Sequence, residues 1–431
     1  MHKLLLVWTC LEYAGYGHRV KPSSHQFFSS EEEANADAWE KVRPMLLALR
    51  YPANGIALVR NHDPVMRVLP DKPLEQLNRY DFNRRVLLAS AVASVVSPVL
   101  PALAADAKIY DVPSSVSDKR ILITGANTGL GLESAKRLAK AGAKLVLTAR
   151  TQAKADATLA EVKRAAPEAD VAVLVLDLAS LESIRKFPTQ YDAKINAPLD
   201  VLMANAGVMA IPERLTTADG FERQLGVNHL GHFALVSGMM PALKKAKNGF
   251  RIISVSSEGH RFANEQSMRT ALASDLDPQE YSQWGNYGLS KAANIIFANE
   301  LQRRFDRAGV QGSAVSLHPG GVATDLGRYL VQGVDAAEAG VPLTETFASM
   351  NPIQKLLFES LQKVVLTVQQ GANTQLFLAA AADSGGDLTK DGGKYFDNMK
   401  VSKPDGFTNR EDLAQQLFAV SERLTGTKIS I

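Results

Sequence analysis

Hydrophobic and polar positions change their arrangement along the chain near residue 115. From about residue 118 onward, short apolar runs alternate with stretches in which apolar residues recur at helical spacing. The pattern predicts strands at 120–124, 143–149, 171–176, 199–204, 251–256 and 312–317, and helices at 132–141, 152–164, 181–187, 227–245 and 287–308. Because strands and helices alternate and the strands are apolar on both faces, we expect an α/β fold in which helices cover both faces of a doubly wound parallel sheet.

Residues 1–115 follow neither period and are interpreted as an N-terminal extension to a single domain at 116–431. Paired arginines at 84–85 precede an uncharged run that ends in Ala-Leu-Ala-Ala at residue 105. This arrangement predicts a targeting segment at 84–105 and fits a twin-arginine export signal. Its depth in the chain is closer to the second part of a bipartite plastid presequence, although the ten acidic residues before it argue against a transit peptide. A membrane-surface anchor and a weakly hydrophobic linker stay open as alternatives.

Composition narrows the class of protein. Hydrophobic residues make up 46% and charged residues 22% of the 431 residues, which is ordinary for a soluble globular protein. The formal net charge of +3 gives no support to nucleic-acid binding. Cys10 is the single cysteine, so neither an internal disulfide nor a cysteine-based zinc site can form, and the eight histidines show no zinc-protease spacing. The class of protein that remains is a soluble enzyme or binding protein with a large core and without a metal site.

A glycine-rich turn follows the first predicted strand. It has the sequence Thr-Gly-Ala-Asn-Thr-Gly-Leu-Gly at 124–131 and leads into a helix. A phosphate group needs close backbone approach, N–H donors and the positive end of a helix dipole, and glycines between a strand and a helix allow all three. A turn with a structural role alone is the alternative. We expect a dinucleotide to contact Gly125, Asn127, Thr128, Gly129, Leu130 and Gly131.

The end of the second predicted strand distinguishes the two nicotinamide dinucleotides. NAD sites usually carry an acidic residue there, which binds the ribose, whereas this chain has Arg150. Because an arginine accommodates the additional 2′-phosphate, NADP (NADPH) is expected and NAD is disfavoured; a surface arginine is the alternative. Asp177 and Leu178, after the third strand, are expected beside the adenine, although Asp177 could equally cap the following helix.

Tyr287 and Lys291 are the sharpest signal for chemistry. They lie four residues apart and therefore share one face of a predicted helix. A tyrosine with an ordinary pKa of about 10 is a poor acid–base group at neutral pH, and we expect the neighbouring ammonium group to lower that pKa. The tyrosine can then pass a proton to a carbonyl that receives hydride. Ser257 follows a strand, where doubly wound sheets bind their ligands.

Together these motifs resemble the short-chain dehydrogenase/reductase superfamily over about residues 118–425. Asn-Ala-Gly at 205–207, Asn228, and His-Pro-Gly-Gly-Val-Ala-Thr at 318–324 also match the family pattern. The resemblance implies a Rossmann-type fold and a catalytic tetrad of Asn228, Ser257, Tyr287 and Lys291. It also implies cofactor contacts from Asn205, Ala206, Gly207, Tyr287, Lys291, Pro319, Gly320, Val322 and Thr324.

The resemblance also implies a role for each tetrad residue. Asn228 would hold a helix kink and a water molecule that feeds protons to Lys291. Ser257 would bind the substrate carbonyl, and Tyr287 would pass the proton. Lys291 would bind the nicotinamide ribose and tune Tyr287.

Within the superfamily the chain is similar to the retinol dehydrogenase-like branch, which also includes the protochlorophyllide reductases. Asn-His-Leu-Gly-His-Phe at 228–233 and Ser-Ser-Glu-Gly-His at 256–260 carry this similarity. Protochlorophyllide reductases use an active-site cysteine, and its absence from the catalytic domain argues against that activity. Residues 258–286 are interpreted as an inserted loop over the site. Residues 327–368 are interpreted as a second variable segment whose apolar residues form either a lid or ordinary core.

Two functions from different classes stay open. The first is an NADP(H)-dependent oxidoreductase that transfers hydride between nicotinamide and a small-molecule lipophilic carbonyl or alcohol. The second is a dinucleotide-binding redox sensor or complex subunit in which catalysis is incidental. The resemblance leaves open a homodimer through the fourth and fifth helices and an association with a membrane surface. A plastid location, with thylakoid association, is the expectation from the targeting segment.

Overall fold

A sheet of eight strands organises the part of the chain that the computed structural model describes, which is residues 108–277, 280–322, 324–329, 334–339, 366–380 and 388–431. These residues belong to one unit, Ala107–Ser349 with Val365–Ile431. The strands are β1 Arg120–Ile123, β2 Lys144–Ala149, β3 Val171–Val175, β4 Val201–Ala204, β5 Phe250–Val255, β6 Gly312–His318, β7 Tyr395–Asp397 and β8 Lys400–Ser402.

The strand order is β3-β2-β1-β4-β5-β6-β7-β8, and neighbours are parallel except for the antiparallel pair of β7 and β8. Ile121 of β1 pairs with Leu145 of β2 on one side and with Val201 of β4 on the other. The order of strands along the chain therefore reverses between β1 and β4. In a doubly wound sheet the ligand crevice lies at this point, outside the carboxyl ends of the strands. The predicted Rossmann-type α/β fold is confirmed.

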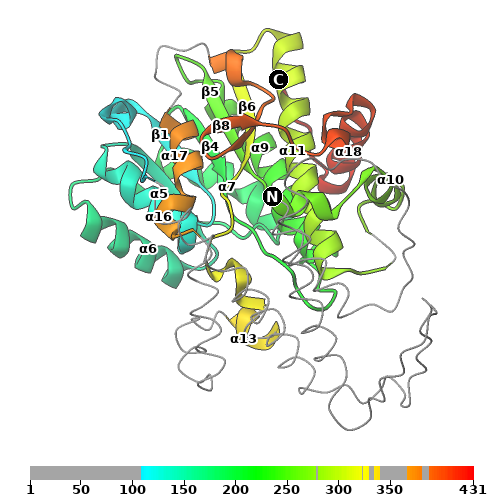
Figure 1. Cartoon of the computed structure of the whole chain (residues 1–431). Helices are drawn as coiled ribbons and strands as arrows, with labels where there is room; N and C mark the ends of the chain where they lie inside the picture. Colours follow the sequence, from blue (N-terminus) through cyan, green and yellow to red (C-terminus); the bar gives the residue numbers. More distant parts are fainter. Residues whose placement is uncertain (1–107, 278–279, 323, 330–333, 340–365, 381–387) are drawn as a thin grey trace, which may run out of the picture. The chain divides into compact units, whose positions relative to one another are not determined.

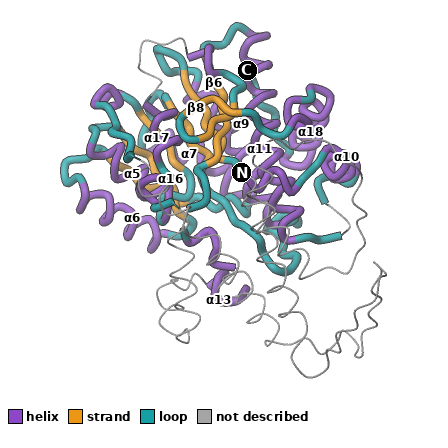
Figure 2. Tube along the Cα trace, viewed as in Figure 1, coloured by secondary structure: helices purple, strands orange, loops and turns teal. Residues whose placement is uncertain are grey.

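Helices cover both faces of the sheet, as Figure 1 shows. Side chains from α5, α6 and α17 pack on one face, and side chains from α7, α9 and α11 pack on the other. Figure 2 shows the helices in purple around the orange strands. A π-helical turn, Gly226–Leu230, leads directly into α9. The helices are α5 Gly129–Lys140, α6 Gln152–Ala165, α7 Leu181–Lys194, α8 Arg223–Leu225, α9 Gly231–Leu243, α10 Glu265–Ala273, α11 Gln283–Ala308, α13 Val334–Ala339, α16 Val368–Gly371, α17 Asn373–Ala380 and α18 Glu411–Thr425.

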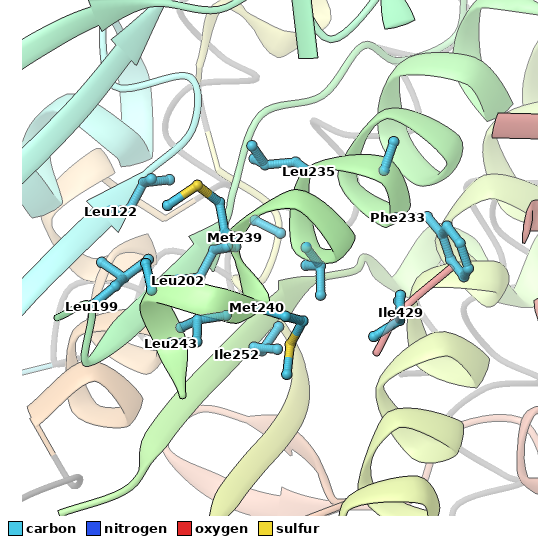
Figure 3. Close-up of a cluster of buried hydrophobic side chains, with 14 of the residues drawn as sticks. Leu122, Leu199, Leu202, Phe233, Leu235, Met239, Met240, Leu243, Ile252 and Ile429 are labelled. Carbon is cyan, nitrogen blue, oxygen red and sulfur yellow. The ribbon is translucent and has the colours of Figure 1, made fainter. Parts of the chain in front are cut away.

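The core beneath α9 fixes this helix on the sheet. Met239 and Met240 of α9 lie toward Leu122, Leu202 and Ile252 of β1, β4 and β5 (Figure 3). Each of these five side chains is at most 1% exposed. Burying an apolar side chain of this size contributes about 1.5–3 kcal/mol relative to leaving it in water. The packing therefore determines where α9 starts, and with it the position of the π-helical turn.

Helix α18 packs across α9 and α11. The ring of Phe418 is fully buried, with its centroid 5.1 Å from that of Phe233 in α9 and 5.6 Å from that of Phe297 in α11. Arg304 of α11 lies over the same ring, 3.9 Å from its centroid. Side chains of α18 therefore occupy part of the surface of the fourth and fifth helices, through which the resemblance leaves a homodimer open. That homodimer stays a prediction.

Several boundaries differ from those predicted. Helix α7 continues through Pro188 to Lys194, although the prediction ended it at residue 187. Pro188 fits against Gly238 of α9, where an added Cβ would lie 2.8 Å from the proline ring, so packing outweighs the local preference to stop. The segment 258–286 is more than a loop, because it contains a 3-10 helix at Glu258–Phe262, α10 and the first turn of α11.

Two predicted regions fall on residues outside the described part of the chain. They are the targeting segment at 84–105 and the apolar residues Phe347, Met350, Leu356, Leu357 and Phe358 of the variable segment. The division of the chain at residue 115 stays a prediction. Among the described residues, no helix combines the length and the apolar character that crossing a membrane requires.

Candidate active site

The glycine turn lies between β1 and α5, at the reversal in strand order. Gly125 and Gly129 have φ values of +65° and +53°, a region that residues with a Cβ rarely adopt. An added Cβ on Gly131 would lie 2.4 Å from the carbonyl oxygen of Gly125. Thr128 is the N-cap residue of α5 but its side chain makes no cap hydrogen bond, and the first turn of α5 has no acidic residue. The backbone and the positive end of the helix dipole therefore fit a phosphate group.

The Asn-Ala-Gly sequence at 205–207 lies against this turn. The amide nitrogen of Asn205 donates to the carbonyl oxygen of Thr124 over 2.8 Å, and the backbone N–H groups of Asn205 and Ala206 both donate to Thr124 Oγ1. Gly207 faces the tetrad, because an added Cβ would lie 3.1 Å from Asn228 Oδ1 and 3.4 Å from Lys291 Nζ. This sequence therefore joins the predicted cofactor residues to the predicted catalytic residues.

Asn228 lies at the centre of the π-helical turn and is fully buried. Its side-chain oxygen accepts from the backbone N–H of Val208 at 2.8 Å, and its side-chain nitrogen donates to the carbonyl oxygen of Val208 and to Ser290 Oγ, each at 2.9 Å. The helix irregularity expected at Asn228 is present. The side chain of Asn228 thus ties Val208, directly after the Asn-Ala-Gly sequence, to Ser290 of α11.

Ser257 follows β5 and caps the short helix Glu258–Phe262. Its hydroxyl oxygen accepts from the backbone N–H of Gly259 at 3.0 Å. An added Cβ on Gly259 would lie 2.6 Å from the ring of Tyr287, so only glycine lets the two come together here. Ser256 is buried instead, and its hydroxyl donates to the carbonyl oxygen of Lys291 at 2.7 Å, so its hydrogen bond serves the packing of α11 on β5.

Tyr287 and Lys291 are both 3% exposed on one face of α11. The ammonium group of Lys291 donates to the carbonyl oxygen of Val255 at 3.1 Å and lies 5.7 Å from the centroid of the Tyr287 ring. Burial raises the pKa of Tyr287 to about 12, against a smaller lowering by its hydrogen bond with Ser257, and burial lowers the pKa of Lys291 to about 8. The expected lowering of the Tyr287 pKa by Lys291 is therefore wrong in this structure, because desolvation by burial sets the direction of the shift and the opposing cause is the hydrogen bond with Ser257.

The segment after β6 approaches the glycine turn from the other side. Gly320 follows Pro319 with a φ of +83°, and Val322 forms a bridge to Leu366. Thr324 comes closest, because an added Cβ on Gly129 would lie 3.4 Å from its methyl group. Thr324 thus lies beside the turn that holds Gly125 to Gly131. The cofactor contacts predicted for Pro319, Gly320, Val322 and Thr324 stay predictions.

Arg150 is exposed at the end of β2. The pKa of Lys154, in the first turn of α6, is lowered by burial and then by the nearby charges of Arg150 and Arg328. Sequence reasoning missed Lys154 and Arg328, although Lys154 lies one helical turn after Arg150. The charges of Arg150 and Arg328 both act on Lys154, and these three cationic side chains are termed the basic cluster.

Asp177 and Leu178 follow β3. The carboxylate of Asp177 accepts from the backbone N–H of Ala179 at 2.9 Å, and Ser180 takes the N-cap position of α7. Asp177 is therefore not the helix cap that was the alternative reading. Leu178 is 7% exposed and packs mainly in the core. Their contact with adenine stays a prediction.

Comparison with known proteins identifies the family. A family model for short chain dehydrogenases matches residues 119–268. The human WW domain-containing oxidoreductase is 36% identical over 310 residues, which is 71% of this chain and 68% of that protein. Human retinol dehydrogenase 13 is 35% identical over 317 residues, which is 73% of this chain and 86% of that protein. The chain belongs to the short-chain dehydrogenase/reductase superfamily, in its retinol dehydrogenase-like branch.

Two further similarities extend this result. This short-chain dehydrogenase/reductase is 32% identical over 320 residues to the chloroplastic short-chain dehydrogenase TIC 32 B of Brassica napus, which is 73% of this chain and 91% of that protein. A crystal structure of an uncharacterised protein from Mycobacterium paratuberculosis superposes with a TM-score of 0.54 at 29% identity, covering 75% of this chain and all of that one. The protein is therefore an oxidoreductase of a family that uses nicotinamide dinucleotides and small-molecule substrates.

The buried ammonium group of Lys291 should make the stability of this short-chain dehydrogenase/reductase depend on pH. Its pKa is about 8 in the folded protein, against 10.5 for a lysine in water. Between these values the unfolded chain binds a proton that the folded protein does not, so the free energy of unfolding rises with pH. Relative to Lys291→Met, the wild type should gain about 3 kcal/mol between about pH 8 and pH 10.5.

Urea denaturation of the full chain at several pH values measures this difference. The variant Lys245→Met, at an exposed lysine of the same domain, should show no such trend relative to wild type. A difference between wild type and Lys291→Met that is independent of pH would contradict the burial argument.

Proposed function

We propose that this protein is an NADP(H)-dependent reductase, or the reverse dehydrogenase, acting on a lipophilic carbonyl or alcohol. The observation that carries the proposal is the meeting of Ser257, Tyr287, Lys291 and Asn228 beside the glycine turn, where the strand order reverses. Structural packing alone would not require a buried lysine and a buried tyrosine on one helix face next to a strand-end serine. Acid–base chemistry on a carbonyl uses all of them.

The chemistry divides between the cofactor and the chain. NADPH, when bound, supplies the hydride. Tyr287 stays protonated because burial raises its pKa to about 12, and it donates its proton to the carbonyl oxygen. An alkoxide is far more basic than a phenolate, so this transfer stays favourable despite the raised pKa. Ser257 hydrogen-bonds the same oxygen and thereby orients the substrate for Tyr287.

Lys291 and Asn228 support Tyr287 in this proposal. Lys291 has a pKa of about 8, so it is largely protonated near neutral pH and can replace the proton that Tyr287 loses. Asn228 holds Ser290, whose hydroxyl donates to the carbonyl oxygen of Tyr287 at 2.7 Å. This contact fixes the backbone from which the phenol projects.

Aromatic side chains beside Tyr287 support an apolar substrate. The ring centroids of Phe262 and Trp284 are 5.5 Å apart, and Trp284 lies 6.4 Å from Tyr287 in an edge-on arrangement. Both Phe262 and Trp284 are partly buried. They form an apolar wall next to the proton donor, which is the lining that a lipophilic carbonyl requires. The name of the relative retinol dehydrogenase 13 agrees with this substrate class.

We also propose a plastid location with 1–115 as an N-terminal extension and 84–105 as its targeting segment. The chloroplastic relatives support this location, at 32% identity. Import of the full chain into isolated chloroplasts, followed by protease treatment, tests it. A protected and shortened product is expected, and a full-length product that stays digestible would exclude plastid import.

Replacement of Tyr287 by phenylalanine should remove the proton donor and leave the fold. The full chain should oxidise NADPH with at least one member of a panel of lipophilic aldehydes and ketones. Tyr287→Phe should lose about 10²- to 10⁴-fold in kcat, the usual contribution of general acid catalysis. Steady-state kinetics measures this loss.

Tyr191→Phe is the matched control, because Tyr191 is also buried and its hydroxyl donates to the carbonyl oxygen of Ala197, away from the site. Its kcat should equal that of the wild type. NADPH binding without any turnover that needs Tyr287 would favour the alternative function, a dinucleotide-binding sensor or complex subunit.

The basic cluster should decide the choice of dinucleotide. Arg150→Ala and Lys154→Ala should each raise the KM for NADPH about 10- to 100-fold, because each removes a charge-assisted hydrogen bond to the 2′-phosphate. The KM for NADH should change little, since NADH has no such phosphate. Parallel kinetics with both dinucleotides measures the ratio. Arg164→Ala, at the exposed end of the same helix, should alter neither KM. Equal losses with NADPH and NADH would refute a 2′-phosphate site.

A further inference from the structure

His232 is a buried side chain that the proposed reaction does not use. It is the second residue of α9 and is 2% exposed. Its Nδ1 lies 3.0 Å from the backbone carbonyl oxygen of Asn228, and its Nε2 lies 2.9 Å from Thr124 Oγ1. The imidazole ring therefore bridges the end of β1, where the glycine turn starts, and the π-helical turn that contains Asn228.

The direction of each hydrogen bond follows from its partners. A carbonyl oxygen only accepts, so Nδ1 of His232 carries a hydrogen and donates to Asn228. Thr124 Oγ1 already accepts from the backbone N–H groups of Asn205, at 2.9 Å, and Ala206, at 3.0 Å. Two acceptors lie within reach of its own hydrogen, the carbonyl oxygen of Met203 at 3.4 Å and Nε2 of His232 at 2.9 Å. The carbonyl oxygen of Met203 already accepts from the backbone N–H groups of Thr124 and Asn205, so the shorter contact assigns the hydrogen to His232. A neutral ring with its proton on Nδ1 satisfies every partner, and burial, the largest cause, lowers the pKa of His232 to about 4.

The hydrogen bonds continue from Asn228 to the proton donor. The side chain of Asn228 donates to Ser290 Oγ at 2.9 Å, and Ser290 donates to the backbone carbonyl oxygen of Tyr287 at 2.7 Å. Thr124, His232, Asn228, Ser290 and Tyr287 are each at most 3% exposed. Buried hydrogen bonds, joined at Asn228 through its own backbone and side chain, therefore connect the glycine turn to the backbone of Tyr287. Loss of one such partner leaves a buried polar group unpaired, which lowers the stability of the folded protein.

We propose that His232 is a positioning residue that couples the glycine turn to the catalytic tetrad. It touches neither substrate nor nicotinamide. Its ring fixes the carbonyl oxygen of Asn228 relative to Thr124. When a dinucleotide orders the glycine turn, the π-helical turn and the first turns of α11, which carry Tyr287, become ordered as well. The part of this inference that involves a dinucleotide rests on the cofactor site proposed above.

His229 provides a matched comparison within the same motif. It is 1% exposed, but its Nε2 lies 2.9 Å from Ser421 Oγ of α18. Its ring packs against Phe233 and Phe297, with centroids 6.2 Å and 5.9 Å away. A buried histidine with a purely structural role is thus present three residues before His232, directed at the C-terminal helix instead of the glycine turn.

Hydrogen–deuterium exchange of the full chain, with and without NADPH, tests the coupling. In the wild type, NADPH should slow amide exchange at 125–131 and also at 226–232. In His232→Phe, NADPH should still protect 125–131, but its protection of 226–232 should fall about tenfold, the ratio that one net buried hydrogen bond represents. In His229→Phe both effects should match the wild type. Equal NADPH protection of 226–232 in His232→Phe and in the wild type would overturn the proposal.

A second pair of variants tests the coupling without any dinucleotide. Thr124→Val removes the hydroxyl that donates to His232, whereas Thr124→Ser keeps it. Exchange at 226–232 should be about tenfold faster in the valine variant and unchanged in the serine variant. This comparison tests the coupling even if NADPH does not slow exchange in the glycine turn. The absence of that NADPH effect would count against the proposed cofactor site, not against the coupling. Unchanged exchange in Thr124→Val would overturn the coupling.

The tautomer gives a spectroscopic check on the same variants. In ¹⁵N-histidine spectra, His232 should carry its proton on Nδ1, and Thr124→Val should shift its Nε2 resonance while leaving that of His229 in place. A proton on Nε2 of His232 would contradict the hydrogen-bond directions on which the coupling depends.

Discussion

Buried polar groups must be hydrogen-bonded, and this constraint organises the carboxyl edge of the sheet. Several chain segments meet there with backbone and side-chain groups that water does not reach, because helices cover both faces of the strands. Thr124 pairs with Asn205, and Asn228 pairs with Ser290, although the partners of each pair lie far apart in the sequence. Leaving one such group without a partner costs about 1–3 kcal/mol. The arrangement of the site therefore follows from satisfying these groups and from the helix packing that brings them together.

The same desolvation sets the electrostatics of the site. Tyr287 and Lys291 are shifted in opposite senses, because burial disfavours the phenolate of one and the ammonium ion of the other. The two pKa values thereby differ by about 4, in the opposite sense to a simple ion-pair picture. The tyrosine is kept as an acid and the lysine is brought close to physiological pH. Such a pair suits a proton that leaves the tyrosine and is replaced through the lysine.

Sequence reasoning reached the fold and the identity of the clustered residues because both depend on local, repeated signals. The alternation of apolar strands with helices predicts the sheet, and the spacing of Tyr287 and Lys291 predicts their common face. Sequence reasoning could not predict features that depend on desolvation or on packing between distant segments. The sign of the Tyr287 shift depends on exclusion of water, and the continuation of α7 through Pro188 depends on Gly238 of α9. Arg328 comes near Lys154 only through the fold. β7 and β8 have three residues each, too few for a period-2 pattern.

The packing of α18 has a consequence for the order in which the molecule can form. Phe418 fills the space between Phe233 and Phe297, and Ile429 belongs to the same core as α9. These contacts join parts of the chain that are far apart in sequence, which is slow to achieve and impossible during early synthesis. Until residues 411–429 have left the ribosome, α9 and α11 expose aromatic surface. A chaperone bound to that surface would have to dissociate before α18 packs on α9 and α11. Passage of an unfolded chain through a membrane would likewise have to be complete before this packing.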